Sequence, residues 1–158
     1  MTQNDIVLVV SVSVINGDEV LIIKENKPFA MNKWNFPSGH IEYKEDILDA
    51  ACREVKEETG FDVKLTGTTG VYNFISSSND QVILFHFTGE IIGGSLRIEE
   101  DVIIDSNWIK VSELMNFDNN QLREPSVIRQ IVDRIVNQKV HPITVFNERL
   151  IPGKEDLI

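Results

Sequence analysis

The segment from Asp46 to Gly60 has the clearest local structure in the sequence, and it constrains how the rest of the chain can pack. Asp46 is a good helix N-cap, because its carboxylate can accept hydrogen bonds from the unpaired amides of the first turn. Gly60 stands where a left-handed C-terminal cap belongs. At about 100° per residue, the small and apolar side chains between them form one stripe, made of Leu48, Ala51, Cys52 and Val55. The sequence therefore predicts an amphipathic helix over residues 46–59 with this stripe against the core.

The same predicted helix carries three glutamates on a second face. Glu54, Glu57 and Glu58 are spaced i, i+3 and i+4, so their side chains share one side of the helix, and each like-charge pair costs a few tenths of a kcal/mol. They also lie near the helix C-terminus, where the helix dipole disfavours negative charge. A bound divalent cation would offset both costs, since Mg²⁺ takes oxygen ligands. The alternative is a solvated acidic face, which is common on surface helices.

Two neighbouring features favour the metal site over the solvated face. Arg53 immediately precedes the first of the glutamates, and its planar guanidinium can hold a carboxylate in a fixed rotamer. Upstream, Pro37-Ser38-Gly39 predicts a tight turn that brings backbone carbonyls toward the same cations.

The stretch from Gly39 to Phe61 resembles the Nudix box: Gly, five residues, Glu, seven residues, Arg-Glu, an apolar residue, any residue, Glu-Glu, any residue, Gly and an apolar residue. Trp34–Pro37 before it and Trp108–Leu114 after it also look like the surroundings of that box in the family. The resemblance therefore covers most of the chain. Ser38 departs from it, because many relatives have a second glycine there. The box positions are filled by Gly39, Glu45, Arg53, Glu54, Val55, Glu57, Glu58, Gly60 and Phe61.

The resemblance implies a fold and a class of chemistry. The fold is of the α/β (α+β) class, an α/β/α sandwich with a mixed sheet in which the box forms a loop–helix–loop. The chemistry is hydrolysis of a nucleoside diphosphate linked to another group, with Mg²⁺ as the cofactor and Mn²⁺ as a possible substitute. A metal ion in such a site neutralises phosphate oxygens and acidifies a bound water that attacks phosphorus.

The resemblance also implies roles for the box carboxylates. Glu57 and Glu58 are expected to bind metal, and Glu54 to be either a further ligand or the base that activates water. Arg53 is expected to orient these carboxylates. Glu45 is expected to be a structural partner of Arg53 or an outer ligand.

Residues outside the helix complete the expected site. Ser38 would offer its backbone carbonyl to a metal. One more metal carboxylate often comes from the loop before the Trp108 strand in relatives, and Glu100 is the candidate, with Glu99 and Asp101 as rivals; each is otherwise a solvated loop charge. His40 and Arg123 are candidates to contact substrate phosphate, against readings as an exposed loop histidine and a surface residue of a helix start.

The remaining sequence is expected to form strands and one further long helix in a single domain over residues 1–158. Asn16-Gly17 between the β-rich runs 6–15 and 20–23 predicts a hairpin. Residues 62–75 and 81–92 are predicted strands, 26–45 are predicted to be mostly loop with a short strand near Trp34, and 124–137 are predicted to be helical.

Charge and composition limit the partners. The net charge is −10, from 25 acidic and 15 basic residues, and without a basic cluster this disfavours nucleic acid. No apolar run approaches the length of about 20 residues that spans a bilayer, and the N-terminus lacks a secretory pattern. Cys52 is the single cysteine, which favours a reducing, cytoplasmic location. The expected partner is a small phosphorylated molecule, most simply a nucleotide, and the choice between a monomer and a homodimer stays open.

A looser resemblance concerns the branch of the family. Trp34–Glu42 and Leu122–Ser126 look like bacterial small Nudix phosphatases, which act on nucleoside tri- and diphosphates and on thiamine-pathway pyrophosphates. Other Nudix activities remain as alternatives, namely cleavage of ADP-ribose, of dinucleoside polyphosphates or of an oxidised nucleotide. A non-catalytic Nudix-fold module that binds nucleotides is the alternative of another class, although such modules usually lose the box carboxylates that this sequence retains.

Overall fold

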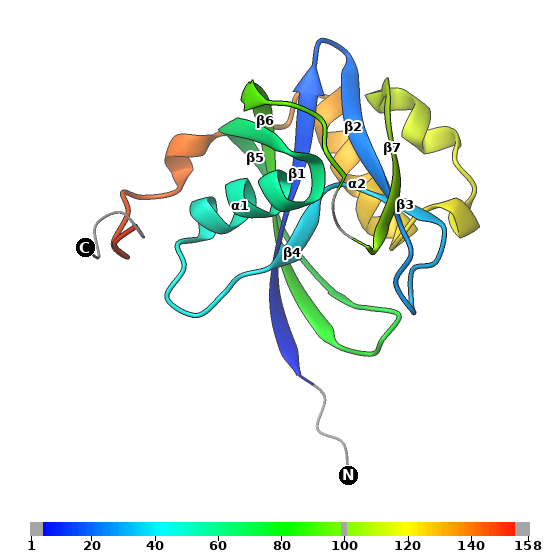
Figure 1. Ribbon diagram of the computed structural model, residues 1–158, viewed down its shortest axis with the longest axis horizontal. Coiled ribbons are helices and arrows are strands. Elements are labelled where there is room, and N and C mark those ends of the chain that lie inside the picture. Colours follow the sequence, from blue (N-terminus) through cyan, green and yellow to red (C-terminus); the bar gives the residue numbers. More distant parts are fainter. Residues whose placement is uncertain (1–4, 99–100, 154–158) are drawn as a thin grey trace.

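A mixed β-sheet runs through the centre of the molecule (Figure 1). The structure is a computed structural model that describes residues 5–98 and 101–153. In these residues the strand order is β3-β2-β1-β6-β5-β8, with β4 paired to β1 and β7 paired to β2. Among the strand pairs of the described residues, β1–β6 alone is parallel. The strands are β1 Ile6–Asn16, β2 Glu19–Glu25, β3 Lys33–Asn35, β4 Ser38–His40, β5 Phe61–Ile75, β6 Gln81–Gly94, β7 Ile103–Lys110 and β8 His141–Pro142.

The predicted hairpin at Asn16-Gly17 is confirmed, but its two strands separate almost at once. Gly17 has a φ of 64°, as a tight hairpin turn requires. Only Ile15↔Val20 and Asn16↔Glu19 are paired between β1 and β2. The rest of β1 runs parallel to β6 and antiparallel to the short β4. β1 therefore links the two halves of the sheet, and β4 lies within a stretch that the sequence predicts to be mostly loop.

Helix α1, Ile47–Thr59, forms where the cap signals place it. The Asp46 carboxylate accepts hydrogen bonds from the amides of Leu48 and Asp49, at 3.0 and 3.4 Å. Gly60 ends the helix with a φ of 84°, and a Cβ there would lie 2.3 Å from the Ser95 carbonyl oxygen. Of the predicted stripe, Ala51 and Val55 are fully buried, whereas Leu48 and Cys52 are half-buried at its edge.

Helix α2, Pro125–Val136, is the second α-helix of the described chain. It covers the face of the sheet opposite to α1 (Figure 1), and it begins and ends within one residue of its predicted bounds. Short 3₁₀ helices connect the remaining elements: η1 Val111–Asn116, η2 Asn119–Gln121 and η3 Ile143–Val145. The arrangement confirms the expected α/β/α sandwich with a mixed sheet.

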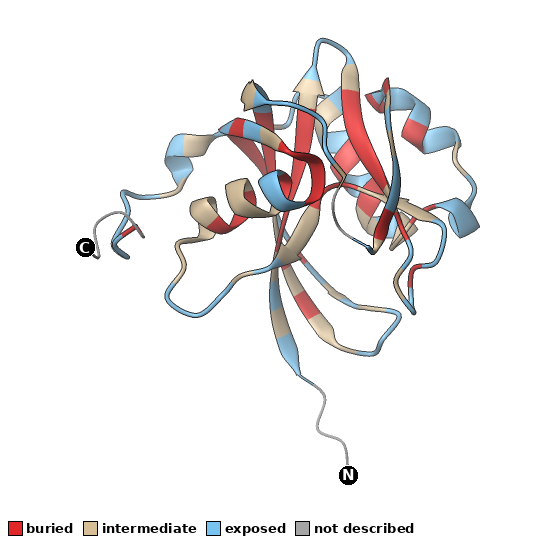
Figure 2. Cartoon of the chain, viewed as in Figure 1, coloured by how far each residue is buried: buried red, intermediate tan, exposed pale blue. Residues whose placement is uncertain are grey.

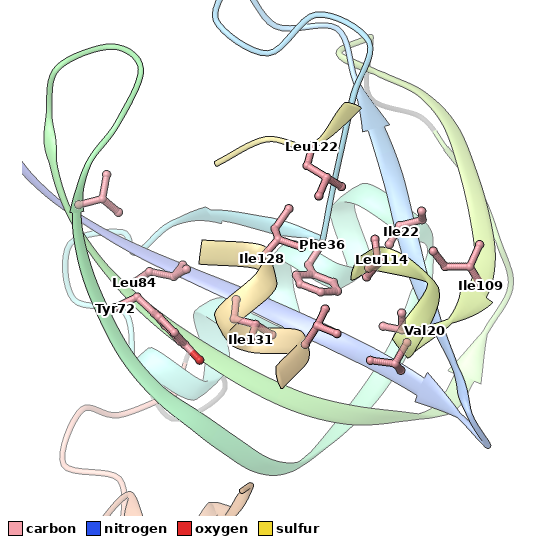
Figure 3. Packing of buried hydrophobic residues seen from close by; sticks show 13 residues of the cluster. Val20, Ile22, Phe36, Tyr72, Leu84, Ile109, Leu114, Leu122, Ile128 and Ile131 are labelled. Carbon is pink, nitrogen blue, oxygen red and sulfur yellow. The ribbon is translucent and has the colours of Figure 1, made fainter. Parts of the chain in front are cut away.

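Two apolar clusters fill the spaces between the sheet and the helices, and the red segments of Figure 2 follow them along the strands. The cluster under α1 is built around Val10, Val12, Val14, Ala50, Ala51, Val55 and Phe87. The cluster under α2 is larger and includes Phe36, Tyr72, Leu84, Leu114, Leu122, Ile128 and Ile131 (Figure 3). No helix in the described part of the chain is long and apolar enough to cross a membrane.

Candidate active site

Arg53 joins the acidic residues of the box to one another. Its Nε and Nη2 donate to the two carboxylate oxygens of Glu45, at 2.6 and 2.9 Å. Its Nη1 donates to Glu54 at 2.8 Å and to Glu57 at 3.1 Å, and Nη2 also reaches the His40 carbonyl at 3.0 Å. The hydrogen bonds to Glu45 are the largest cause that raises the pKa of the guanidinium. Arg53 thus contacts three carboxylates at once and ties α1 to β4.

The Glu54 carboxylate lies directly against the backbone of Gly39. A Cβ at position 39 would be 2.1 Å from Glu54 Cδ and 2.3 Å from both of its carboxylate oxygens. Any side chain at this position would therefore displace the glutamate. Burial raises the pKa of Glu54, and the hydrogen bond and charge of Arg53 oppose that rise. The box glycine is required here because the carboxylate occupies the space where a side chain would go.

Glu58 points away from solvent and faces β4. It is only 4% exposed, and its Oε1 accepts a hydrogen bond from the Ser38 amide at 2.6 Å. Burial raises its pKa to about 8, and the nearby carboxylates of Glu25 and Glu54 add to the rise, whereas the Ser38 amide and the charge of Lys27 oppose it. A cation next to Glu58 would reverse this shift by stabilising the charged form.

The raised pKa of Glu58 predicts how stability depends on pH without metal. Between the ordinary glutamate pKa of 4.5 and the folded-state value of about 8, the folded protein holds a proton that the unfolded chain has lost. The stabilisation is therefore complete below pH 4.5 and is lost as the pH rises through about 8. We expect the thermal midpoint in EDTA to fall between pH 5 and 8.

Glu58→Gln is the control for this measurement, because an amide does not titrate. The fall of the thermal midpoint between pH 5 and 8 should flatten in this variant. Adding Mg²⁺ to the wild-type protein at pH 8 should raise its thermal midpoint again. An equally steep profile in the variant would assign the pH dependence to other groups.

The carboxylate side chains supply suitable donors for a divalent cation, although they are not yet gathered around one point. Within residues 5–98 and 101–153, no three His, Cys, Asp or Glu side chains form a cluster that could hold a metal ion as it stands. The carboxylates of Glu54, Glu57 and Glu58 offer oxygen atoms as metal ligands, which Mg²⁺ prefers. The Glu57 side chain is 46% exposed, while Glu54 is close enough to Glu58 to affect its pKa. The oxygen donors of these residues therefore fit a hard divalent cation by their chemistry.

The other candidate residues lie around the acidic face of α1, which is formed by Glu54, Glu57 and Glu58. Ser38 contacts Glu58 through its amide, and His40 contacts Arg53 through its carbonyl while also lining the pocket described below. Glu99 and Glu100 lie outside the described residues. Asp101 is exposed in the turn before β7.

A pocket of about 250 Å³ opens beside the acidic face. Its rim includes Ser38, Gly39 and His40, so it adjoins the residues that Glu54 and Glu58 contact. One wall comes from β1 and from the β5–β6 hairpin, and another comes from α2. Its apolar lining is formed by Val7, Val9, Phe36, Phe74, Val82, Leu84, Val127 and Ile131. A pocket with an apolar interior and a polar mouth next to carboxylates suits a small organic molecule that carries phosphate groups.

Three polar residues in or directly behind the pocket wall are not predicted from the sequence, namely Glu25, Lys27 and Asn35. Glu25, at the end of β2, is fully buried and accepts hydrogen bonds from Asn35 and Arg123, and its charge is also paired with Lys27. Of these four residues, the sequence singles out Arg123 alone. The available signal is the alternation Leu21, Ile23, Glu25, which puts the glutamate in phase with two buried residues of a strand.

Comparisons with known proteins give one family. Residues 6–131 match the family described as NUDIX domain. A putative nudix hydrolase of Caenorhabditis elegans is 32% identical over 140 residues, which is 88% of this chain but only 37% of that protein. Phosphatase NudJ of Escherichia coli K12 is 27% identical over 119 residues, covering 75% of this chain and 76% of that one. Among solved structures, a NUDIX hydrolase from Nitrosomonas europaea has a TM-score of 0.78 at 26% identity and covers 90% of this chain and 97% of that chain.

Proposed function

The chain belongs to the Nudix family, and from that premise we propose that it is a Mg²⁺-dependent hydrolase of phosphoanhydride bonds. Its proposed substrates are nucleoside tri- and diphosphates or related small pyrophosphates. The observation that carries this proposal is the shared boundary of the pocket and the acidic face, at Ser38–His40. A molecule whose organic part occupies the pocket would extend its phosphates toward Glu54 and Glu58. The similarity to a protein named as a phosphatase supports the same class of reaction.

The side chains of α1 would divide the work of such a reaction. A bound divalent cation would neutralise phosphate oxygens and lower the pKa of a bound water. Glu57 and Glu58 would hold the cation, and Ser38 would add a backbone carbonyl. Glu54 would act as a further ligand or as the base that accepts the proton from water. Arg53 would keep Glu54 and Glu57 in place, as its hydrogen bonds to both support.

A substrate panel tests the proposal. Nucleoside di- and triphosphates, ADP-ribose, a dinucleoside polyphosphate, an oxidised nucleotide and thiamine pyrophosphate are incubated with Mg²⁺, with Mn²⁺ or with EDTA, and release of phosphate or pyrophosphate is measured. We expect metal-dependent release from nucleotides or small pyrophosphates and none in EDTA. Preference for ADP-ribose, the dinucleoside polyphosphate or the oxidised nucleotide would select one of those alternative activities. No release from any compound, with metal binding demonstrated, would favour a non-catalytic nucleotide-binding module.

A further inference from the structure

Glu25 is a fully buried carboxylate whose hydrogen-bonding and ionic partners all face the pocket. It is 0% exposed, and it does not line the pocket itself. Its Oε1 accepts from Asn35 Nδ2 at 2.9 Å, and its Oε2 accepts from Arg123 Nη1 at 2.8 Å and lies 3.0 Å from Lys27 Nζ. A carboxylate is expensive to bury unless its charge is paired. These three contacts satisfy that requirement.

The three partners come from separate parts of the chain and meet at one side of the pocket. Lys27 follows β2, Asn35 ends β3, and Arg123 precedes α2, yet all three line the pocket. The Lys27 and Arg123 side chains remain about a third exposed, at 32% and 29%. Glu25 therefore gathers the heads of two long cationic side chains that still have surface available for a ligand.

The three charged side chains of this group leave one positive charge unbalanced. Glu25 contributes one negative charge and Lys27 and Arg123 contribute two positive charges, so the group carries a net charge of +1 inside a chain of −10. Both cationic nitrogens contact the same oxygen, Oε2, so they are no farther apart than the sum of those two distances. That spacing allows one phosphate group to contact both cations, and charge-assisted hydrogen bonds of this kind are among the stronger ones.

The same group is connected to the acidic face. Asn35 Nδ2 also donates to Ser38 Oγ at 3.3 Å, and the Ser38 amide donates to Glu58. Burial raises the pKa of Glu54 and of Glu58, and the charge of Lys27 opposes the rise at both. The ammonium of Lys27 is therefore within electrostatic reach of the two carboxylates, between the pocket and α1.

We propose that Lys27 and Arg123 form a phosphate-binding clamp and that Glu25 is its positioning residue, which holds both cations without touching the ligand. The proposal deepens the proposed function, on which it rests for the identity of the ligand as a phosphorylated molecule. Without Glu25, the two cations would repel each other and each would return to solvent. The clamp would bind the phosphate portion of a substrate whose organic portion enters the pocket.

Direct binding of inorganic pyrophosphate in EDTA tests the clamp without requiring turnover. We expect Lys27→Met and Arg123→Met each to weaken binding by about fivefold or more, and Glu25→Gln by about tenfold. Lys64→Met, exposed on β5 and outside the pocket, is the matched charge control and should bind like the wild type. Adding Glu25→Gln to Lys27→Met should weaken binding by no more than about threefold further, because one of the two cations that Glu25 positions is already gone.

Several results would overturn the clamp. The clamp would be wrong if pyrophosphate bound the wild type no better than it binds the single variants Lys27→Met and Arg123→Met. It would also be wrong if Glu25→Gln had an effect of equal size with and without Lys27. Lys27→Met and Arg123→Met keep the test valid even if Glu25→Gln folds poorly, because each leaves Glu25 paired with the other cation. If Glu25→Gln turns over a substrate of the panel, its KM should be higher than that of the wild type and its kcat should stay within about twofold. Loss of turnover across the substrate panel with pyrophosphate binding intact would count against hydrolysis and not against the clamp.

Discussion

Glu58→Gln is expected to lower metal-dependent turnover by about three orders of magnitude while the protein stays folded, which corresponds to about 4 kcal/mol of transition-state stabilisation. The amide has the same shape, and its oxygen can still accept the hydrogen bond from the Ser38 amide. It removes the negative charge that a divalent cation needs. Because burial already raises the pKa of Glu58, a neutral side chain is tolerated well at this position, and the thermal midpoint should be unchanged or higher.

The effect of Glu57→Gln should be similar in turnover but different in origin. The Glu57 side chain is 46% exposed and contacts Arg53, so its loss should appear mainly as a higher Mg²⁺ concentration needed for half-maximal turnover. Glu90→Gln, an exposed carboxylate on β6, is the matched control and should turn over like the wild type. The measurements are kcat and KM across a Mg²⁺ titration, with thermal melting for each variant. Rates close to wild type in both Glu57→Gln and Glu58→Gln would make the metal-site assignment wrong.

The sequence predicts the local features of this molecule well because their signals are themselves local. The N-cap carboxylate of Asp46 and the left-handed Gly60 act within a few residues of the helix they bound. The box spacing places Arg53 beside its glutamates in any α-helix. In contrast, helical spacing puts Glu58 on the polar face of α1, and the structure buries it.

The burial of Glu58 has a long-range cause. The short strand β4 pairs with β1, with Ser38 opposite Ser11, and lays its backbone over the end of α1. Ser38, Gly39 and His40 have weak strand preferences, so the pairing depends on a partner about 30 residues away rather than on local propensity. The buried state of Glu25 has the same kind of cause, since Arg123 is 98 residues away from it in the sequence.

The candidate site therefore consists of a predictable part and an unpredictable part that meet at Ser38. The predictable part is the acidic face of α1 with Arg53. The unpredictable part is the pocket side, where Glu25, Asn35 and Lys27 come together only through the sheet. Ser38 contacts both, through its hydroxyl on one side and its amide on the other. One residue therefore links the two parts of the site.

Arg53→Lys tests whether the acidic face must be held in place by a guanidinium. Arg53 is 16% exposed and donates to Glu45, Glu54, Glu57 and the His40 carbonyl. An ammonium has three donors around one atom and cannot form the paired contact with Glu45 while reaching the others. We expect kcat/KM to fall by about a hundredfold or more, and the free energy of unfolding to fall by roughly 2–4 kcal/mol, because the nearly buried Glu45 carboxylate loses its paired contact with the guanidinium.

Glu45→Gln is the matched control for Arg53→Lys, and it separates stability from positioning. It removes one charge from the paired contact but leaves Arg53 bonded to Glu54 and Glu57, so it should lower stability with a much smaller loss of turnover. Excess Mg²⁺ should recover part of the activity of Arg53→Lys, because a cation among the carboxylates would hold together groups that the ammonium cannot reach at the same time. If Arg53→Lys lost stability but kept its full kcat/KM at saturating Mg²⁺, Arg53 would hold the loop to the helix and would have no role in orienting the carboxylates. A loss of turnover larger than that of Glu45→Gln at equal stability would instead assign the orientation of Glu54 and Glu57 to Arg53.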